Sequence, residues 1–122
     1  MKVQLDNQVA LVTGAAGAIG QAICTSLAAN GAKVVYADIN LEGARRLAAA
    51  TPGAMALRMD VTDEQQIESA ISEIVAAHGR LDILVNNAGI NTMAHRVNDG
   101  AAAARFLQTL RHLIEQPFLG LV

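Results

Sequence analysis

The stretch Val9-Ala-Leu-Val-Thr-Gly-Ala-Ala-Gly-Ala-Ile-Gly20 decides the fold of this 122-residue chain. Its first five residues form a short apolar run, which is typical of a buried strand. Gly14, Gly17 and Gly20 follow in a cluster, and a helical pattern begins at Gln21. A strand that runs into a glycine-rich turn and then a helix predicts the opening unit of an α/β domain.

The rest of the chain alternates between strand patterns and helix patterns. The expected strands cover residues 9–13, 33–38, 55–59 and 81–85, and the expected helices cover 21–30, 41–50 and the segment from the capping-box spacing Thr62-Asp-Glu-Gln65 to Gly79. Each helix is long enough for a crossover, so the strands should be parallel and the connections right-handed. The predicted fold class is α/β, a Rossmann-type doubly wound parallel sheet that is truncated at about four strands in the order 3-2-1-4.

Composition and charge exclude several classes of function. The net charge is −2 and the chain has no basic run, so a nucleic-acid partner is not expected. No apolar run is long enough to span a bilayer and no signal peptide is visible at the N-terminus, so we expect a cytoplasmic protein without a membrane partner. The one cysteine, Cys24, excludes an internal disulfide and reads as a small buried apolar side chain.

The glycine turn is a candidate binding site for a dinucleotide pyrophosphate. Glycines allow a tight turn and close approach of the backbone, and the N-terminus of the following helix offers unpaired N–H groups and a positive dipole end. The alternative is a tight turn with a structural role only. A nucleoside-triphosphate P-loop is not expected, because Gln21 stands where a Lys-Ser/Thr pair is needed.

Asp38 is the candidate acidic partner of that turn. It ends the second expected strand, close to the spacing of about 20 residues at which an acid binds the adenosine ribose. A carboxylate there accepts from ribose hydroxyls and repels a 2′-phosphate, which predicts NAD in preference to NADP. The alternative is a solvated aspartate at a strand end.

Three motifs together resemble the classical short-chain dehydrogenase/reductase family. They are Thr13–Gly20, the pair Asp60-Val61 and the run Asn86-Asn87-Ala88-Gly89, which is the most specific of the three. A methyltransferase could share the glycine turn and the strand-end acid, but the asparagine run is not expected at its fourth strand. The resemblance covers residues 5 to about 92 and implies the N-terminal, coenzyme-binding half of the family's fold.

The resemblance implies a set of cofactor-binding positions. They are Gly14, Gly17, Ile19, Gly20, Asp38, Asp60, Val61, Asn87, Ala88 and Gly89. Within this set, Asp60 and Val61 would flank the adenine, and Asn87–Gly89 would border the adenosine and its ribose. Gly14, Ile19 and Gly20 would line the pyrophosphate and nicotinamide side, and Asn86 would brace the sheet. The alternatives are that Asp60 only braces a turn and that Asn86 only satisfies backbone groups.

One position of the turn departs from the family. Classical members usually have glycine where Ala18 stands, whereas this chain has it at Gly17. The resulting Thr-Gly-x-x-Gly-x-x-Gly pattern is closer to the extended, sugar-nucleotide branch, but Asp60-Val61 and the asparagine run favour the classical branch. Gly17 also leaves no basic side chain where NADP-preferring members often carry one.

The family's catalytic residues are absent from this sequence. The resemblance implies a Tyr-x-x-x-Lys pair with a serine and an asparagine, but the single tyrosine, Tyr36, is followed four residues later by Asn40, and the only lysines are Lys2 and Lys33. We therefore expect no catalytic residues and no activity from the chain alone. No metal-ligand spacing is visible either.

Residues 1–92 are expected to form a dinucleotide-binding half-domain. Residues 93–122 are expected to form a divergent amphipathic helical tail of the same domain. The chain stops in apolar residues, which predicts an element cut short and leaves 81–85 as an exposed sheet edge. Self-association or a completing subunit would cover that edge.

Three functions compete for this sequence. They are an NAD-binding polypeptide of the oxidoreductase family, a non-catalytic module that pairs with another subunit, and a truncated gene remnant. The substrate cannot be inferred.

Overall fold

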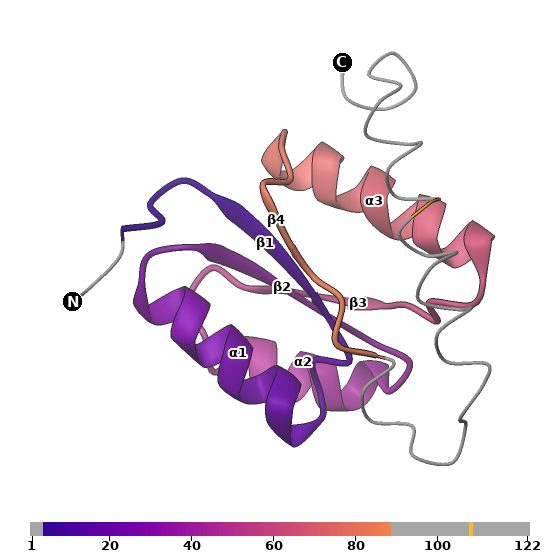
Figure 1. Cartoon of the computed structure of the whole chain (residues 1–122), viewed down its shortest axis with the longest axis horizontal. Helices are drawn as coiled ribbons and strands as arrows, with labels where there is room; N and C mark the ends of the chain where they lie inside the picture. The colour runs from indigo at the N-terminus through magenta and orange to yellow at the C-terminus, as the bar shows by residue number, and fades with distance from the viewer. Residues whose placement is uncertain (1–3, 89–107, 109–122) are drawn as a thin grey trace.

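The computed structural model describes residues 4–88 and residue 108. Residues 4–88 form one four-stranded sheet and three helices, whose arrangement Figure 1 shows. The elements in chain order are β1 (Val9–Thr13), α1 (Ala18–Ala29), β2 (Lys33–Asp38), α2 (Leu41–Ala49), β3 (Met55–Arg58), α3 (Glu64–His78) and β4 (Ile83–Val85). All seven correspond to predicted elements, and their bounds differ from the predicted ones by three residues at most.

The sheet is parallel throughout, with the strand order β3-β2-β1-β4. Leu11 at the middle of β1 lies opposite Val35 on one side and Leu84 on the other. The prediction of a Rossmann-type sheet in the order 3-2-1-4 is therefore confirmed. This order places β1 and β2 at the centre, where the glycine turn and Asp38 leave the sheet at the same edge.

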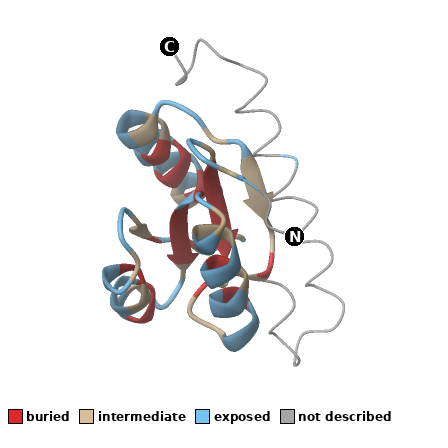
Figure 2. Cartoon of the chain, turned by 90° about the vertical axis from the view of Figure 1, so that its left-hand side faces the viewer, coloured by how far each residue is buried: buried red, intermediate tan, exposed pale blue. Residues whose placement is uncertain are grey.

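Helices cover both faces of the sheet (Figure 1), with α1 and α2 on one face and α3 on the other. Alternate residues of β1 serve the two faces: Leu11 packs with the α3 cluster, whereas Ala10 and Val12 pack with the α1 and α2 cluster. All five residues of β1 are buried, and Figure 2 shows the buried centre of the sheet. Burial of a side chain such as Leu11 contributes about 1.5–3 kcal/mol.

Helix α1 begins at Ala18, three residues earlier than the predicted start at Gln21. The glycine cluster reads as a turn in the sequence, but Gly20 already lies in the first helical turn. A methyl group on Gly20 would overlap the carbonyl oxygen of Gly14. Gly20 is therefore required because the helix and the turn approach each other closely there. A cluster of glycines in a sequence does not show whether a glycine is needed for such close approach or for a loop conformation.

The helix starts follow capping chemistry, with one shift from the predicted register. Asn40 caps α2 as predicted, and its side chain accepts from the N–H of Gly43. For α3, however, the cap is Asp63, one residue after Thr62, and its carboxylate accepts from the N–H groups of Gln65 and Gln66. Aspartate at this position satisfies two N–H groups that the helix leaves unpaired.

Strand β4 begins at Ile83, two residues later than predicted. At Asp82 the backbone N–H still donates to the oxygen of Val9, but the N–H of Val9 donates to the Asp82 side chain. Its carboxylate accepts from the N–H of Val9 at 2.8 Å and forms an ion pair with Arg80 at 2.8 Å. All three residues of β4 are half-buried, in contrast to β1. Among the described residues β4 pairs only with β1, so its outer edge carries no strand there.

Two further expectations have an outcome in the fold. Cys24 is buried and without a disulfide, and burial raises the pKa of its thiol to about 12, as suits a small apolar side chain. None of the helices in the described part of the chain is long and apolar enough to cross a membrane. Apart from Gln108, the predicted tail helix lies outside the described residues.

Asp82→Ala removes the acceptor for Val9 and the partner of Arg80, so we expect the free energy of unfolding at pH 7 to fall by about 1–2 kcal/mol. The hydrogen bond from Arg80, supported by the Val9 N–H, holds the pKa of Asp82 below its usual value. A carboxyl group of this kind stabilises fully above its unfolded pKa of about 3.9, and the stabilisation is lost as the pH falls through the lower folded pKa. Urea unfolding at about pH 7 and below about pH 4 measures both effects.

Arg80→Ala is the matched control, because it leaves the bond between Asp82 and Val9 in place. We expect it to lower the free energy of unfolding less than Asp82→Ala does, because an exposed ion pair contributes little. A penalty for Asp82→Ala that stayed constant down to the lowest pH at which the protein is folded would contradict this assignment.

Candidate functional site

The candidate site lies at the carboxyl ends of β1, β2 and β4, and the hydroxyl group of Thr13 organises it. Thr13 is the last residue of β1 and is 1% exposed. Its oxygen accepts from the N–H groups of Asn87 at 3.0 Å and Ala88 at 3.1 Å, and its proton is donated to Oδ1 of Asn86 at 3.1 Å. A single buried hydroxyl therefore attaches the segment after β4 to the end of β1.

Asn87 continues this attachment to the glycine turn. Its side-chain Nδ2 donates to the carbonyl oxygen of Gly14 at 3.2 Å, and the residue is 1% exposed. Its Oδ1 is buried without a hydrogen-bond partner in the described structure, and such an orphaned acceptor costs about 1–3 kcal/mol. The amide cannot be turned around, because Oδ1 would then face the Gly14 oxygen. The segment that follows β4 therefore holds the glycine turn in place through the hydrogen bond from Asn87 to Gly14.

Gly14 shows why this contact needs a glycine. Its φ is +66°, and an added Cβ would lie 2.9 Å from the Cα of Ala88 and 3.1 Å from Nδ2 of Asn87. Both the backbone conformation and the close approach exclude a side chain. The first glycine of the predicted turn therefore packs directly on two residues of the asparagine run, 73 residues or more further along the chain.

The N-terminus of α1 is open for an anion. Gly17 is its N-cap and forms no side-chain cap, whereas Asn40 and Asp63 cap α2 and α3. The first N–H groups of a helix have no partner within it, and among the described residues no side-chain cap satisfies them at α1. Ile19 lies in the same first turn and is 50% exposed. The turn therefore fits a pyrophosphate group, which needs backbone donors, a positive dipole end and space left by glycines.

Asp38 lies at the end of β2 and faces the glycine turn. Its Oδ2 accepts from the N–H of Ala16 at 2.9 Å, and its Oδ1 accepts from the N–H of Asn40 at 2.8 Å. The residue is half-buried rather than fully solvated. Asp38 therefore lies beside the turn, and its carboxylate has a structural task that the sequence did not reveal. Its role toward a ribose stays a prediction.

Asp60 and Val61 follow β3 and lie further along the same edge of the sheet. Oδ1 of Asp60 accepts from the N–H and the hydroxyl group of Thr62, at 2.9 and 2.7 Å. The N–H of Asp60 donates to the side chain of Gln66. Asp60 therefore braces the turn before α3, which was the structural alternative for this residue. Val61 is half-buried against the core on the α3 face.

Two features beside the glycine turn were not predicted from the sequence. Ile39 is 55% exposed directly after Asp38, an unusual place for a large apolar side chain. An isoleucine that interrupts the polar residues after the second strand was the signal available for it. The role of Thr13 as a shared hydrogen-bond acceptor was the second, and it depends on residues that are distant in sequence.

The structure thus brings Gly14, Gly20, Asn87 and Ala88 into contact and attaches Asp38 to the same turn. It leaves Asp60 and Val61 beside α3, and Gly89 lies outside the described residues. No group of His, Cys, Asp and Glu side chains within residues 4–88 could hold a metal ion.

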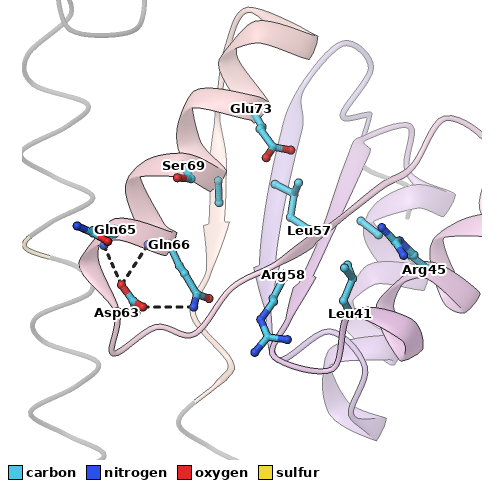
Figure 3. A pocket seen from close by; sticks show the side chains of 11 residues that line it. Leu41, Arg45, Leu57, Arg58, Asp63, Gln65, Gln66, Ser69 and Glu73 are labelled. Carbon is cyan, nitrogen blue, oxygen red and sulfur yellow. Dashed lines mark hydrogen bonds between the residues drawn. The ribbon is translucent and has the colours of Figure 1, made fainter.

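A cavity of about 570 Å³ lies elsewhere, between α2, β3 and α3 (Figure 3). Its lining includes Leu57, Arg58 and Glu73, and Asp63 makes its capping bonds to Gln65 and Gln66 at one end. None of the predicted cofactor-binding residues lines this cavity. It is a groove at the outer edge of β3, so the site is defined by the turn and its backbone donors and not by a deep cavity.

The sequence of this chain is similar to those of known proteins. Residues 8–114 match the family model of the short chain dehydrogenases, so the similarity extends beyond the region of the recognisable motifs. Galactitol 2-dehydrogenase of Agrobacterium fabrum is 47% identical over 93 residues, and 15-hydroxyprostaglandin dehydrogenase (NAD(+)) of Homo sapiens is 42% identical over 95 residues. These matches cover 75% and 73% of this chain and 36% of each relative, so the chain spans about a third of their length.

Among solved structures, the 3-ketoacyl-(acyl-carrier-protein) reductase from Brucella melitensis, complexed with NADH, superposes with a TM-score of 0.73 and is 28% identical. The superposition covers 96% of this chain and 51% of the reductase. Because the family model matches most of its length, this chain belongs to the short-chain dehydrogenases.

Proposed function

We propose that this chain binds NAD(H) at the carboxyl ends of its strands, as the coenzyme-binding part of a short-chain dehydrogenase. The observation that supports it most is the uncapped N-terminus of α1 behind a glycine turn that Asn87 and Ala88 hold in place. When bound, the nicotinamide would supply hydride chemistry. The residues of this chain bind and orient the dinucleotide.

Each proposed binding residue has a task that follows from its position. The N–H groups of Ile19 and Gly20, in the first turn of α1, would bind the pyrophosphate. Asp38 would accept from the adenosine ribose. Ile39 would offer its exposed apolar side chain to one face of the adenine. The remaining proposed contacts are Gly14, Gly17, Asp60, Val61, Asn87, Ala88 and Gly89.

The choice of NAD over NADP is proposed from charge. A 2′-phosphate on the ribose would lie beside the Asp38 carboxylate, whose oxygens already accept from Ala16 and Asn40. Two like charges at contact distance repel by about 1 kcal/mol in water and more at a partly buried site. Gly17 offers no cation to offset this repulsion.

We further propose that the chain alone is not a catalyst. Tyr36 is the only tyrosine, and it is buried on the α1 and α2 face with its hydroxyl group bonded to that of Thr51 at 2.8 Å. It cannot serve as an acid or base at the carboxyl edge of the sheet. On this proposal, residues 1–92 are the binding unit and residues 93–122 are a tail of the same domain, of which the family model still matches the residues up to 114.

A second candidate function, pairing with another subunit, is favoured by one observation. Ile83, Leu84 and Val85 are apolar, yet each is half-exposed, and the outer edge of β4 carries no strand within the described residues. A flat apolar edge without proline or lysine is a template for pairing. A second copy or another polypeptide would satisfy it.

Cofactor choice is tested by calorimetric titration of the folded protein with NAD and with NADP. We expect NAD to bind at least about tenfold more tightly, because of the repulsion by Asp38. Asp38→Ala should shrink this ratio, whereas Glu42→Gln, which removes an exposed charge from the first turn of α2, should leave it unchanged. Equal or tighter binding of NADP to the unmodified protein would overturn the proposed preference.

Inactivity is tested with a panel of alcohols and ketones in the presence of NAD or NADH. We expect no turnover above background, because loss of a general acid/base alone typically costs about 10²- to 10⁴-fold. Gly14→Val is the control, since its φ of +66° excludes a valine and the turn would be lost. Turnover that is reproducible in pure protein and abolished by this substitution would reveal an unrecognised catalytic site.

Association through β4 is tested by sedimentation at micromolar concentration. We expect self-association, aggregation or a co-purifying partner, and Leu84→Lys should shift the distribution toward monomer because an edge lysine disfavours strand pairing. Ile39→Lys removes an exposed isoleucine elsewhere and should have no such effect. A monodisperse monomer with a cooperative thermal transition would show that the edge is already covered.

A further inference from the structure

We infer that Asp38 is also a positioning residue for the phosphate turn, independently of any contact with a ribose. The inference rests on the proposed dinucleotide site and adds a task to one of its residues. The observation behind it is the 2.9 Å hydrogen bond from the N–H of Ala16 to Oδ2 of Asp38, which joins residues 22 positions apart.

Ala16 lies at the middle of the turn, between Gly14 and Gly17. The turn has a bond of its own, from the N–H of Gly17 to the oxygen of Gly14 at 3.2 Å, and one to β2, from the N–H of Ala15 to the oxygen of Ala37 at 3.1 Å. The Ala16 bond is the shortest of the three and has a charged acceptor, and hydrogen bonds to ionised acceptors are the stronger ones.

The other carboxylate oxygen keeps Asp38 in this position. Oδ1 accepts from the N–H of Asn40 at 2.8 Å, and Asn40 in turn caps α2. The carboxylate therefore connects the turn on one side with the start of α2 on the other. Loss of the side chain would free the Ala16 N–H and let the middle of the turn move away from β2.

The two possible roles of Asp38 predict opposite signs for a ligand without ribose hydroxyls. If Asp38 only recognised the ribose, removing its negative charge would leave the affinity for such a diphosphate unchanged or raise it, because like charges repel. If Asp38 also positions the turn, its removal lowers that affinity, because the pyrophosphate donors lose their arrangement.

The experiment is calorimetric titration of the full chain with ADP and with its 2′,3′-dideoxy analogue. We expect Asp38→Ala to weaken binding of the dideoxy analogue by about threefold to tenfold, a fraction of what a hydrogen bond to a charged group contributes. Glu42→Gln, the matched loss of a nearby exposed carboxylate, should leave binding equal or slightly tighter. Unchanged or tighter binding of the dideoxy analogue to Asp38→Ala would overturn the inference.

A second measurement needs no ligand. The amide proton of Ala16 should exchange with solvent faster in Asp38→Ala than in the unmodified protein, because it loses its acceptor, whereas Glu42→Gln should leave this exchange rate unchanged. An Ala16 amide that exchanges equally fast in Asp38→Ala and in the unmodified protein would also overturn the inference. Failure of the unmodified protein to bind ADP would instead refute the proposed function, and the exchange of the Ala16 amide would still decide whether Asp38 positions the turn.

Discussion

The buried hydroxyl group of Thr13 is the interaction on which the rest of this site depends. It accepts from two backbone N–H groups of the segment after β4 and donates to Asn86, so every bond that the hydroxyl can usefully make is used. Without it, the N–H of Asn87 would keep only the carbonyl oxygen of Val85, at 3.1 Å, and the N–H of Ala88 would lose its bond to β1. A hydrogen bond of this kind contributes about 0.5–1.5 kcal/mol, and this one oxygen accepts two of them.

The glycines of the turn follow from that attachment. Because Thr13 holds Asn87 and Ala88 against the end of β1, the backbone at Gly14 has no room for a Cβ. Gly20 meets the same crowding from the opposite side, where it faces the Gly14 carbonyl and Nδ2 of Asn87. The motifs on β1 and after β4 are therefore two halves of one packing arrangement in this chain.

Residues with an expected ligand role also stabilise the free protein. Asp38 holds Ala16 and Asn40, and Asp60 holds Thr62 and the turn before α3. These bonds keep the carboxylates in fixed positions before a ligand arrives, and preorganised groups lose less entropy on binding. On the proposed function, a substitution at either position would change both folding and binding, and only ligands that lack one contact would separate the two effects.

Much of this protein could be predicted from local patterns. Several elements are determined by contacts within a few residues, as at the buried run 9–13, the β-branched run 33–38 and the cap at Asn40. The alternation of these strands and helices then predicted the fold class and the strand order. The predicted bounds differ from the structure near Gly20 and Asp82, where residues distant in sequence make contacts: Nδ2 of Asn87 approaches Gly20, and the N–H of Val9 donates to the Asp82 side chain.

The same limit applies to the candidate site. The sequence determined which residue types line the carboxyl edge of the sheet. Tertiary structure alone decided that Thr13 serves Asn87 and Ala88 and that Asp38 holds Ala16, because such bonds depend on which strand ends are neighbours in space.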